Sequence, residues 1–186
     1  DFHGTIVNDV TVPNPANPQQ QLYTGMFEII TGSVAYSAPA GPTFAQLGLS
    51  TGVLTAKQYA YYLTLPPAAQ DAFVQNVLDG VVAQYGYSVT GIQDPSIAAS
   101  FTVGGPVAAH HYGWTEFEVH AQTKALTMTT WGVDWFSPQE ATSDPASIIA
   151  RPITVRQRFT VQSRLPQCPA DRDGNRHVDG VDLAVM

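Results

Sequence analysis

WTEFEVH at residues 114–120 and ALTMTTWGVDWF at 125–136 are the stretches that decide how this chain folds. In a β-strand successive side chains point to opposite faces, so every second residue shares a face. The polar residues AQTK at 121–124 lie between the two stretches and predict a turn. We therefore expect an antiparallel hairpin. One face would carry Thr115, Phe117 and Val119, and the other would carry Trp114, Glu116, Glu118 and His120.

Further strands are predicted on both sides of this hairpin. GTIVNDVTV at 4–12 is rich in β-branched residues and runs into a polar, proline-containing loop, and MFEIITGSVAY at 26–36 follows as a second strand. ITVRQRFTV at 153–161 alternates so that Arg156 and Arg158 share one solvated face. The sequence therefore predicts a β-rich framework.

The middle of the chain predicts helices. TAKQYAYYL at 55–63 has Thr55 as its N-cap, and a second helix should run from Pro66 to Tyr85, where Gly86 ends it. SAPAGP at 37–42 and residues 86–112 are predicted as loops. The aromatic residues of this region are expected to pack in the helical core; they are Tyr59, Tyr61, Tyr62, Phe73, Tyr85 and Tyr87.

Composition excludes several classes of protein. Hydrophobic residues make up 44% of the 186 residues and charged residues only 12%, so a disordered chain is excluded. The net charge is −7 without a basic cluster, which argues against nucleic-acid binding. No apolar run reaches the ~18 residues that would span a membrane. The length of 186 residues predicts one domain, or one domain with a small appendage.

The segment DRDGNRHVDGVD at 171–182 predicts a calcium loop. Calcium binds six to eight oxygen atoms, which a loop of twelve residues supplies at alternating positions. Arg176 stands at the sixth position, where glycine would turn the chain more easily. A solvated acidic tail is the alternative interpretation. The predicted ligands are Asp171, Asp173, Asn175, Asp179 and Asp182 through their side chains and His177 through its carbonyl oxygen.

The four residues DFHG at 1–4 suggest a second metal site. Asp1 and His3 are two positions apart, so on a strand end a carboxylate oxygen and an imidazole nitrogen would reach the same side. So short a motif is also compatible with an ordinary pair of polar residues at a strand end.

The order of motifs resembles the end of the PhoD-like family of metallophosphatases, also called alkaline phosphatase D. The resemblance rests on DFHG, on FEIITGS at 27–33 and on HHYGW at 110–114, and it covers residues 1–163. It implies that Asp1 and His3 bind a dinuclear centre of Fe³⁺ with Ca²⁺ that hydrolyses a phosphate ester. The family's remaining ligands come from earlier motifs. We therefore expect this chain to be the C-terminal part of a secreted enzyme and to be inactive alone.

The calcium loop resembles a dockerin type I repeat, D-x-N-G-D-G-x-V-x-x-x-D-L. The resemblance covers residues 171–186, one repeat, whereas a dockerin uses two repeats to bind a cohesin. A cohesin-like or cell-surface partner is therefore an expectation for this segment.

Together these features predict an α/β fold. Residues 1–163 would be the C-terminal part of a metallophosphatase-type β-sandwich flanked by helices, with a helical insertion at about 55–85. A linker at 164–170 and an EF-hand-like, dockerin-like repeat at 171–186 would follow. The alternative is a non-catalytic extracellular binding or adhesion module with the same tail, for which Trp114, Trp131 and Trp135 on one face would form a sugar-binding strip.

Three residues have no assigned role at this stage. His110 and His111 could lie near the substrate, although a loop pair satisfied by hydrogen bonds and water is the plainer interpretation. Cys168 is the only cysteine, which excludes a disulfide within these 186 residues.

Overall fold

A computed structural model describes residues 4–32 and 38–162 of the chain, and all structural statements below concern these residues. Its strands are β1 (Thr5–Asn14), β2 (Asn17–Thr31), β3 (Ala99–Val103), β4 (Val107–Ala108), β5 (His111–Val119), β6 (Leu126–Asp134) and β7 (Thr154–Val161). Its helices are α1 (Ala40–Ser50), α2 (Ala56–Tyr62), α3 (Pro67–Gln84), α4 (Pro138–Ser143) and α5 (Pro145–Ile149).

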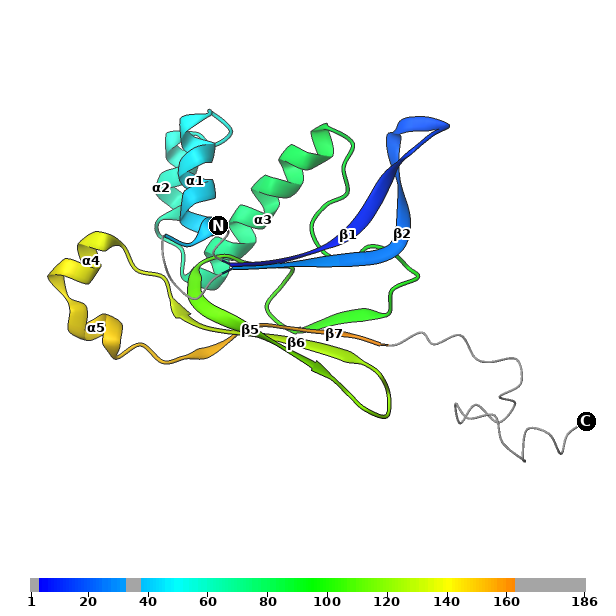
Figure 1. Ribbon diagram of the computed structural model, residues 1–186. Coiled ribbons are helices and arrows are strands. Elements are labelled where there is room, and N and C mark those ends of the chain that lie inside the picture. The colour runs from blue at the N-terminus through cyan, green and yellow to red at the C-terminus, as the bar shows by residue number, and fades with distance from the viewer. Residues whose placement is uncertain (1–3, 33–37, 163–186) are drawn as a thin grey trace, which may run out of the picture.

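The strands form two antiparallel sheets. One has three strands in the order β2-β1-β4, and the other has four in the order β3-β7-β6-β5. Figure 1 shows the β1–β2 hairpin lying over the second sheet, while α1, α2 and α3 gather at the end where β1 begins. The expected mixture of helices and strands is thus confirmed at the level of helices combined with antiparallel sheets.

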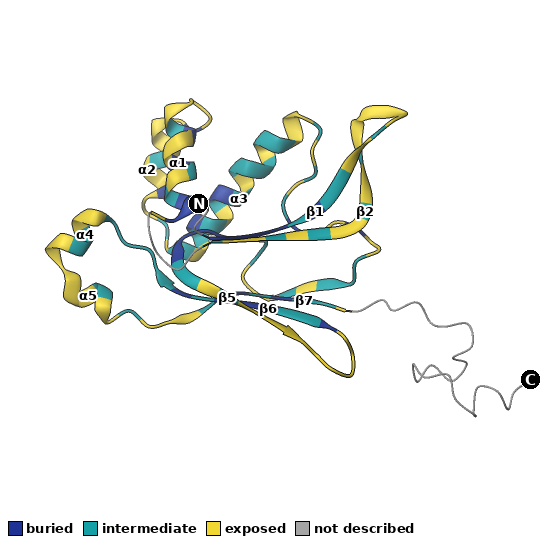
Figure 2. Ribbon diagram, viewed as in Figure 1, coloured by how far each residue is buried: buried dark blue, intermediate teal, exposed yellow. Residues whose placement is uncertain are grey.

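The space between the sheets is filled from both sides. Val7 of β1, Met128 of β6 and Phe159 of β7 are fully buried against one another. On the other face of β1, Ile6 packs with Ala40 of α1 and with Val107 of β4. Strand alternation therefore lets β1 contact the second sheet with one face and the helices with the other. Figure 2 shows the buried residues concentrated where these layers meet.

The β5–β6 hairpin has the predicted form. Trp114 pairs with Trp131 and Thr115 with Thr130, so alternate residues lie on the expected faces. Trp135 lies beyond the end of β6, and its indole Nε1 donates to Gln70 Oε1 at 2.9 Å. The prediction of three tryptophans in one strip is therefore wrong for Trp135, because a buried polar partner on α3 draws its side chain toward the helices.

The N-terminal hairpin is longer than predicted. The prolines at 13 and 18 lie within β1 and β2, and a short turn at residues 15–16 replaces the expected polar loop. The register shifts between Val10 and Thr11, where Thr24 and Gly25 occupy the opposite strand without pairing. β2 is an edge strand of its sheet, where a proline that donates no hydrogen bond is tolerated.

The helices at 56–62 and 67–84 confirm the prediction. Thr55 caps α2 in a capping box with Gln58, and Gly86 follows α3 with φ of +77°. The helical region begins earlier than about 55, however, because α1 starts in the predicted SAPAGP loop. Proline is compatible with a first helical turn, so this segment did not need to be a loop.

Residues 86–112 are also not a continuous loop. β3 pairs with β7, and β4 pairs with Thr5 and Ile6 of β1. Such short strands form because they pair with strands far away in the sequence. The pattern of residues within the short segment itself does not reveal this pairing.

The aromatic residues of the helical region divide into two groups. Tyr62 is 1% exposed and belongs to the core, whereas Tyr61, Tyr85 and Tyr87 are largely exposed. The expectation of core packing is therefore wrong for these three. Within the described part of the chain, no helix has the length and apolarity needed to cross a membrane.

Candidate functional site

The predicted ligand residues lie outside the described residues. This holds for Asp1 and His3, for the linker and for the calcium ligands Asp171, Asp173, Asn175, His177, Asp179 and Asp182. The structure does describe Gly4, the residue covalently joined to His3, and therefore shows what surrounds the point where β1 begins.

Gly4 sits where three segments meet. Its carbonyl oxygen accepts a hydrogen bond of 3.0 Å from the backbone N–H of Gly32, which follows β2. A Cβ atom at Gly4 would lie 2.9 Å from the carbonyl oxygen of Ala108 in β4, and φ is +151°. Glycine therefore permits the close approach of β1 and β4 here.

His110 lies at the centre of a buried chain of side chains. Its Nδ1 lies 2.7 Å from Asp71 Oδ1 of α3, and its Nε2 lies 2.7 Å from the Tyr62 hydroxyl of α2. A carboxylate only accepts, so Nδ1 donates to Asp71, and in this tautomer Nε2 accepts from the Tyr62 hydroxyl. Burial raises the pKa of Tyr62, so its hydroxyl keeps the proton that it donates.

The backbone around His110 is bound to the same groups. Asp71 Oδ1 also accepts from the Ala109 N–H at 2.6 Å, and the Gly41 N–H of α1 donates to the Ala109 carbonyl oxygen at 2.8 Å. A Cβ atom at Gly41 would lie 2.2 Å from His110 Cε1. Glycine thus lets α1 lie directly against the imidazole ring, and all three neighbouring helices contact this segment.

His111 has a different environment. It begins β5 on the face that Gly113 and Thr115 share, and it is 4% exposed. Its Nδ1 has no hydrogen-bond partner among the described residues. Burial lowers its pKa to about 4, a shift that nearby Asp71 opposes. The ring is therefore neutral near pH 7 and carries a nitrogen that no described group uses.

A small polar cavity connects His111 with the beginning of β1. Gly4, Thr5 and Gly32 line it on one side, and His111 and Thr115 line it on the other. It leaves about 10 Å³ for the centre of a water-sized molecule. The hydroxyl groups of Thr5, Thr115 and Thr130 hydrogen-bond to one another beside it, at 3.1 to 3.4 Å. The cavity therefore suits a water molecule or a single ion.

Two other buried atoms, Asp9 Oδ1 and Gln157 Oε1, lack hydrogen-bond partners in the described part of the chain, but another atom of each side chain forms hydrogen bonds. Asp9 accepts from the backbone N–H groups of Gln93 and Asp94 through its other oxygen. The amide nitrogen of Gln157 donates to the Gly105 carbonyl oxygen. Neither residue borders the cavity at Gly4, so of these three residues only His111 lines the same cavity as Gly4.

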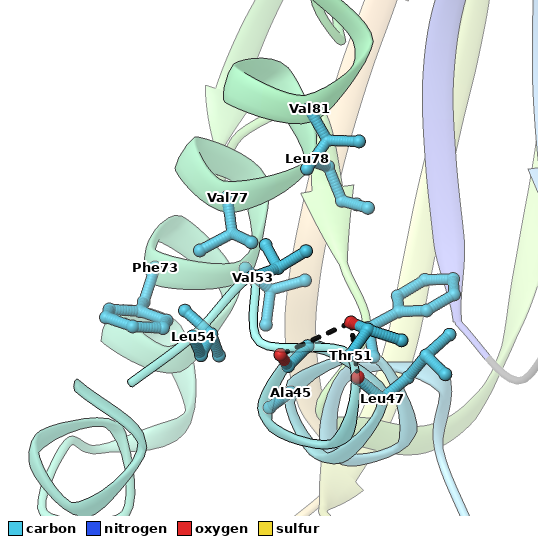
Figure 3. Close-up of a pocket in the computed structure, with 12 residues that line it drawn as sticks. Ala45, Leu47, Thr51, Val53, Leu54, Phe73, Val77, Leu78 and Val81 are labelled. Atoms are coloured by element: carbon cyan, nitrogen blue, oxygen red, sulfur yellow. Dashed lines mark hydrogen bonds between the residues drawn. The ribbon is translucent and has the colours of Figure 1, made fainter. Parts of the chain in front are cut away.

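An apolar hollow of about 160 Å³ lies elsewhere, between α1, the segment after it and α3. Figure 3 shows Leu54, Phe73, Val77 and Leu78 around it. Its polar side chain, Thr51, hydrogen-bonds to carbonyl oxygens at the end of α1. The hollow therefore offers no group for acid–base or metal chemistry.

The two adjacent histidines have different environments. His110 is satisfied by hydrogen bonds, although it is buried rather than in a solvated loop. His111 begins β5, so the expectation of a loop is wrong for this residue, and its Nδ1 has no hydrogen-bond partner among the described residues. His120 is exposed as expected. The described residues contain no group of three or more His, Cys, Asp or Glu side chains that could hold a metal by itself.

Three comparisons with known proteins found no similar protein. A scan against models of protein families, a search of curated proteins and a search of solved structures each find no match to this chain.

The hydrogen bonds that link Asp71, His110 and Tyr62 predict that Tyr62→Phe lowers the stability of the fold. Removing the hydroxyl leaves Nε2 of His110 buried without a partner, which should lower the free energy of unfolding by ~1–3 kcal/mol. Urea denaturation followed by circular dichroism measures this loss. Tyr61→Phe is the matched control, because Tyr61 is 59% exposed on the same helix. Equal stability of the two variants would contradict the assigned hydrogen bond.

The buried neutral ring of His111 predicts a pH dependence of stability. An unfolded histidine takes up a proton near pH 6.5, whereas His111 in the folded chain does so only near pH 4. Between these values the unfolded state binds more protons, so the free energy of unfolding should fall as the pH falls, by at most ~1.4 kcal/mol per pH unit.

Urea denaturation at several pH values between 4 and 7 tests this slope. His111→Gln should flatten it, and His120→Gln should leave it unchanged. The other charged or titratable groups that act on His111 are Asp71, Arg156, His110 and Asp134, and they are intact in both variants. An unchanged slope in His111→Gln would show that another group causes the dependence.

Proposed function

We propose that the full-length protein containing this chain is a secreted, metal-dependent phosphoric ester hydrolase resembling the PhoD family. The observation that carries the proposal is the position of Gly4, because it joins the motif DFH to the cavity that His111 borders. Covalent geometry keeps the Cα atom of His3 about 3.8 Å from that of Gly4.

The residues at this end of the fold are compatible with a metal centre. Asp1 and His3 are the proposed ligands of the dinuclear Fe³⁺ and Ca²⁺ centre. Nδ1 of His111, which has no partner among the residues that the structure describes, is a buried polar atom of the kind expected beside such a group. When bound, two such ions polarise a phosphoryl oxygen and lower the pKa of a bound water. Gly4 and the three threonine hydroxyl groups hold the adjoining backbone of β1 in place.

The calcium loop is proposed to give the enzyme a docking segment. Six oxygen donors at 171, 173, 175, 177, 179 and 182 support this proposal through their spacing. Its partner would be a cohesin-like or cell-surface protein.

One surface favours the alternative of a non-catalytic binding module. Trp114 and Trp131 pair across β5 and β6 on the face opposite His111, and both indole N–H groups donate to Glu116. Trp114 is 39% exposed, so a flat aromatic area is available there. A sugar-binding surface would use this area and would not need Asp1 or His3.

The hydrolase proposal predicts that Asp1→Asn and His3→Ala each abolish turnover in the full-length protein, because each removes a ligand of the metal centre. Hydrolysis of a bis-aryl phosphate and elemental analysis of the purified protein measure activity and metal content, and both should fall together. His120→Gln, at an exposed residue outside this cavity, is the control and should retain both. A folded wild-type protein without divalent-metal-dependent hydrolysis would contradict the proposal and favour the binding module.

The calcium loop predicts that a peptide of residues 164–186 joined to its natural continuation binds Ca²⁺. Asp171→Ala should weaken this binding, because it removes a carboxylate ligand, and isothermal titration calorimetry measures the change. Absence of heat from the unsubstituted peptide would identify the segment as a solvated acidic tail.

A further inference from the structure

We infer that the cavity between the first half of α3 and the turn that joins β3 to β4 binds a small organic cation, an ammonium group on a short aliphatic chain. Asp71 and Gln75 of α3 line this cavity and accept the hydrogen bonds of the ammonium group. The cavity shares no lining residue with the one beside Gly4, so the inference does not depend on the proposed hydrolase.

The first argument is that Asp71 offers a carboxylate oxygen to this cavity. Its Oδ1 accepts from the Ala109 N–H at 2.6 Å and from His110 Nδ1 at 2.7 Å. Among the described residues no group donates to Oδ2, and the side chain is 18% exposed. A carboxylate binds a cationic donor strongly, because charge attraction adds to the hydrogen bond. The hydrogen bonds of Oδ1 thus fix the orientation of Asp71 and leave Oδ2 for a ligand.

Gln75 supplies a second acceptor on the same face of α3. It follows Asp71 by four residues, a spacing at which the side chains of a helix are neighbours with Cβ atoms about 5–6 Å apart. Its side chain is half-buried and forms no hydrogen bond with another residue that the structure describes. An ammonium group has three donors, so it can bond to Asp71 and Gln75 at once.

Two glycines keep the space in front of Gln75 open. Gly104 has φ of +67°, and a Cβ atom there would lie 2.5 Å from the carbonyl oxygen of Arg156, so glycine lets the turn lie directly against β7. A Cβ atom at Gly105 would lie 3.6 Å from Gln75 Oε1. A longer side chain at Gly105 would therefore occupy the place of the ligand.

The cavity also has the size and the walls for a short aliphatic chain. Its volume is about 210 Å³, and an apolar cavity of roughly 150 Å³ is large enough for a benzene molecule. Ala68, Ala72 and Val107 line it with methyl groups. The alkyl part of the ligand would lie against these residues while its ammonium group faces Asp71.

The charges at the cavity favour a cation over an anion or a metal ion. Arg156 also lines it, but its guanidinium is already bound, with Nη1 donating to Asp134 at 2.6 Å and Nε to the Gly132 carbonyl oxygen at 3.0 Å. Asp71 is paired with no lysine or arginine in the described part of the chain. Calcium would need six or more oxygen ligands, whereas this lining provides one carboxylate.

Saturation-transfer difference NMR of the full-length protein tests the inference, with n-butylammonium as the probe and butyrate as the matched anion. A ligand of this size should bind with a dissociation constant on the order of 1 mM, which this ligand-detected method measures. We expect n-butylammonium to bind and butyrate not to bind, because the Asp71 carboxylate attracts the first and repels the second. Absence of n-butylammonium binding, or equal binding of the two probes, would overturn the inference.

Two matched variants separate this cavity from the general negative charge of the chain. Gln75→Glu and Asn76→Glu each add one carboxylate to α3, but Asn76 is exposed and does not line the cavity. Gln75→Glu should tighten n-butylammonium binding about fivefold, because the new charge lies next to the ammonium group. Asn76→Glu should have little effect at about 0.15 M salt, which screens the more distant charge. An equal effect of the two variants would contradict the assigned site.

Asp71→Asn tests the charged acceptor itself. The asparagine carbonyl oxygen can keep the hydrogen bonds of Oδ1, while an amide that only donates replaces Oδ2, so binding should weaken about tenfold or more. Circular dichroism checks that the variant is folded. Unchanged binding by the folded variant would show that Asp71 is not the acceptor.

A crystal of the wild-type protein soaked with n-butylammonium gives a measurement that does not depend on any variant. We expect the ammonium nitrogen at about 2.7–2.9 Å from Asp71 Oδ2. A cavity filled with water alone, or a probe molecule bound only elsewhere, would overturn the inference.

Discussion

The hydrogen-bonded chain from Asp71 through His110 to Tyr62 holds the helices against the sheets. It joins α3 and α2 to the segment between β4 and β5, and Gly41 brings α1 against the same ring. Removing one hydrogen-bonding group from a buried network lowers the free energy of unfolding by more than the net contribution of the hydrogen bond. The reason is that the remaining polar group stays buried without water or a partner. The position of the helices relative to the strands therefore depends on these polar contacts as well as on the apolar packing of Ile6, Ala40 and Val107.

The same segment determines what His111 can do. Since His110 is turned toward the helices and bound at both nitrogens, the next residue enters β5 with its ring on the side of β1. The beginning of β1, the residue after β2 and the first residue of β5 then border one cavity. The two adjacent histidines thus differ, because His110 is hydrogen-bonded at both nitrogens whereas Nδ1 of His111 has no partner among the described residues. This difference gives a physical reason to look for a ligand of the His111 ring and none to look for a ligand of the His110 ring.

Much of the local structure could be predicted from the sequence. Thr55 and Gln58 form a capping box within four residues, and the alternation at 114–119 places alternate side chains on two faces. Other elements depend on distant partners: β4 has two residues and exists because β1 pairs with it, and α1 begins where prolines suggested a loop. The exposed tyrosines show the same limit, since aromatic character predicts burial only where a neighbouring element covers the ring.

For the candidate site, the sequence by itself determined which residues can act as ligands and how they are spaced, because Asp1, His3 and the calcium loop are local patterns. It also determined the helix caps and the hairpin, whose interactions lie within a few residues. Only the tertiary structure distinguished His110 from His111. The two residues are adjacent in the chain, but the partners of His110 lie 39 and 48 residues away, and the cavity beside His111 is formed by segments from the beginning and middle of the chain. The environment of a buried imidazole is set by elements that meet only on folding, and this environment decides whether its nitrogens are free to bind a ligand.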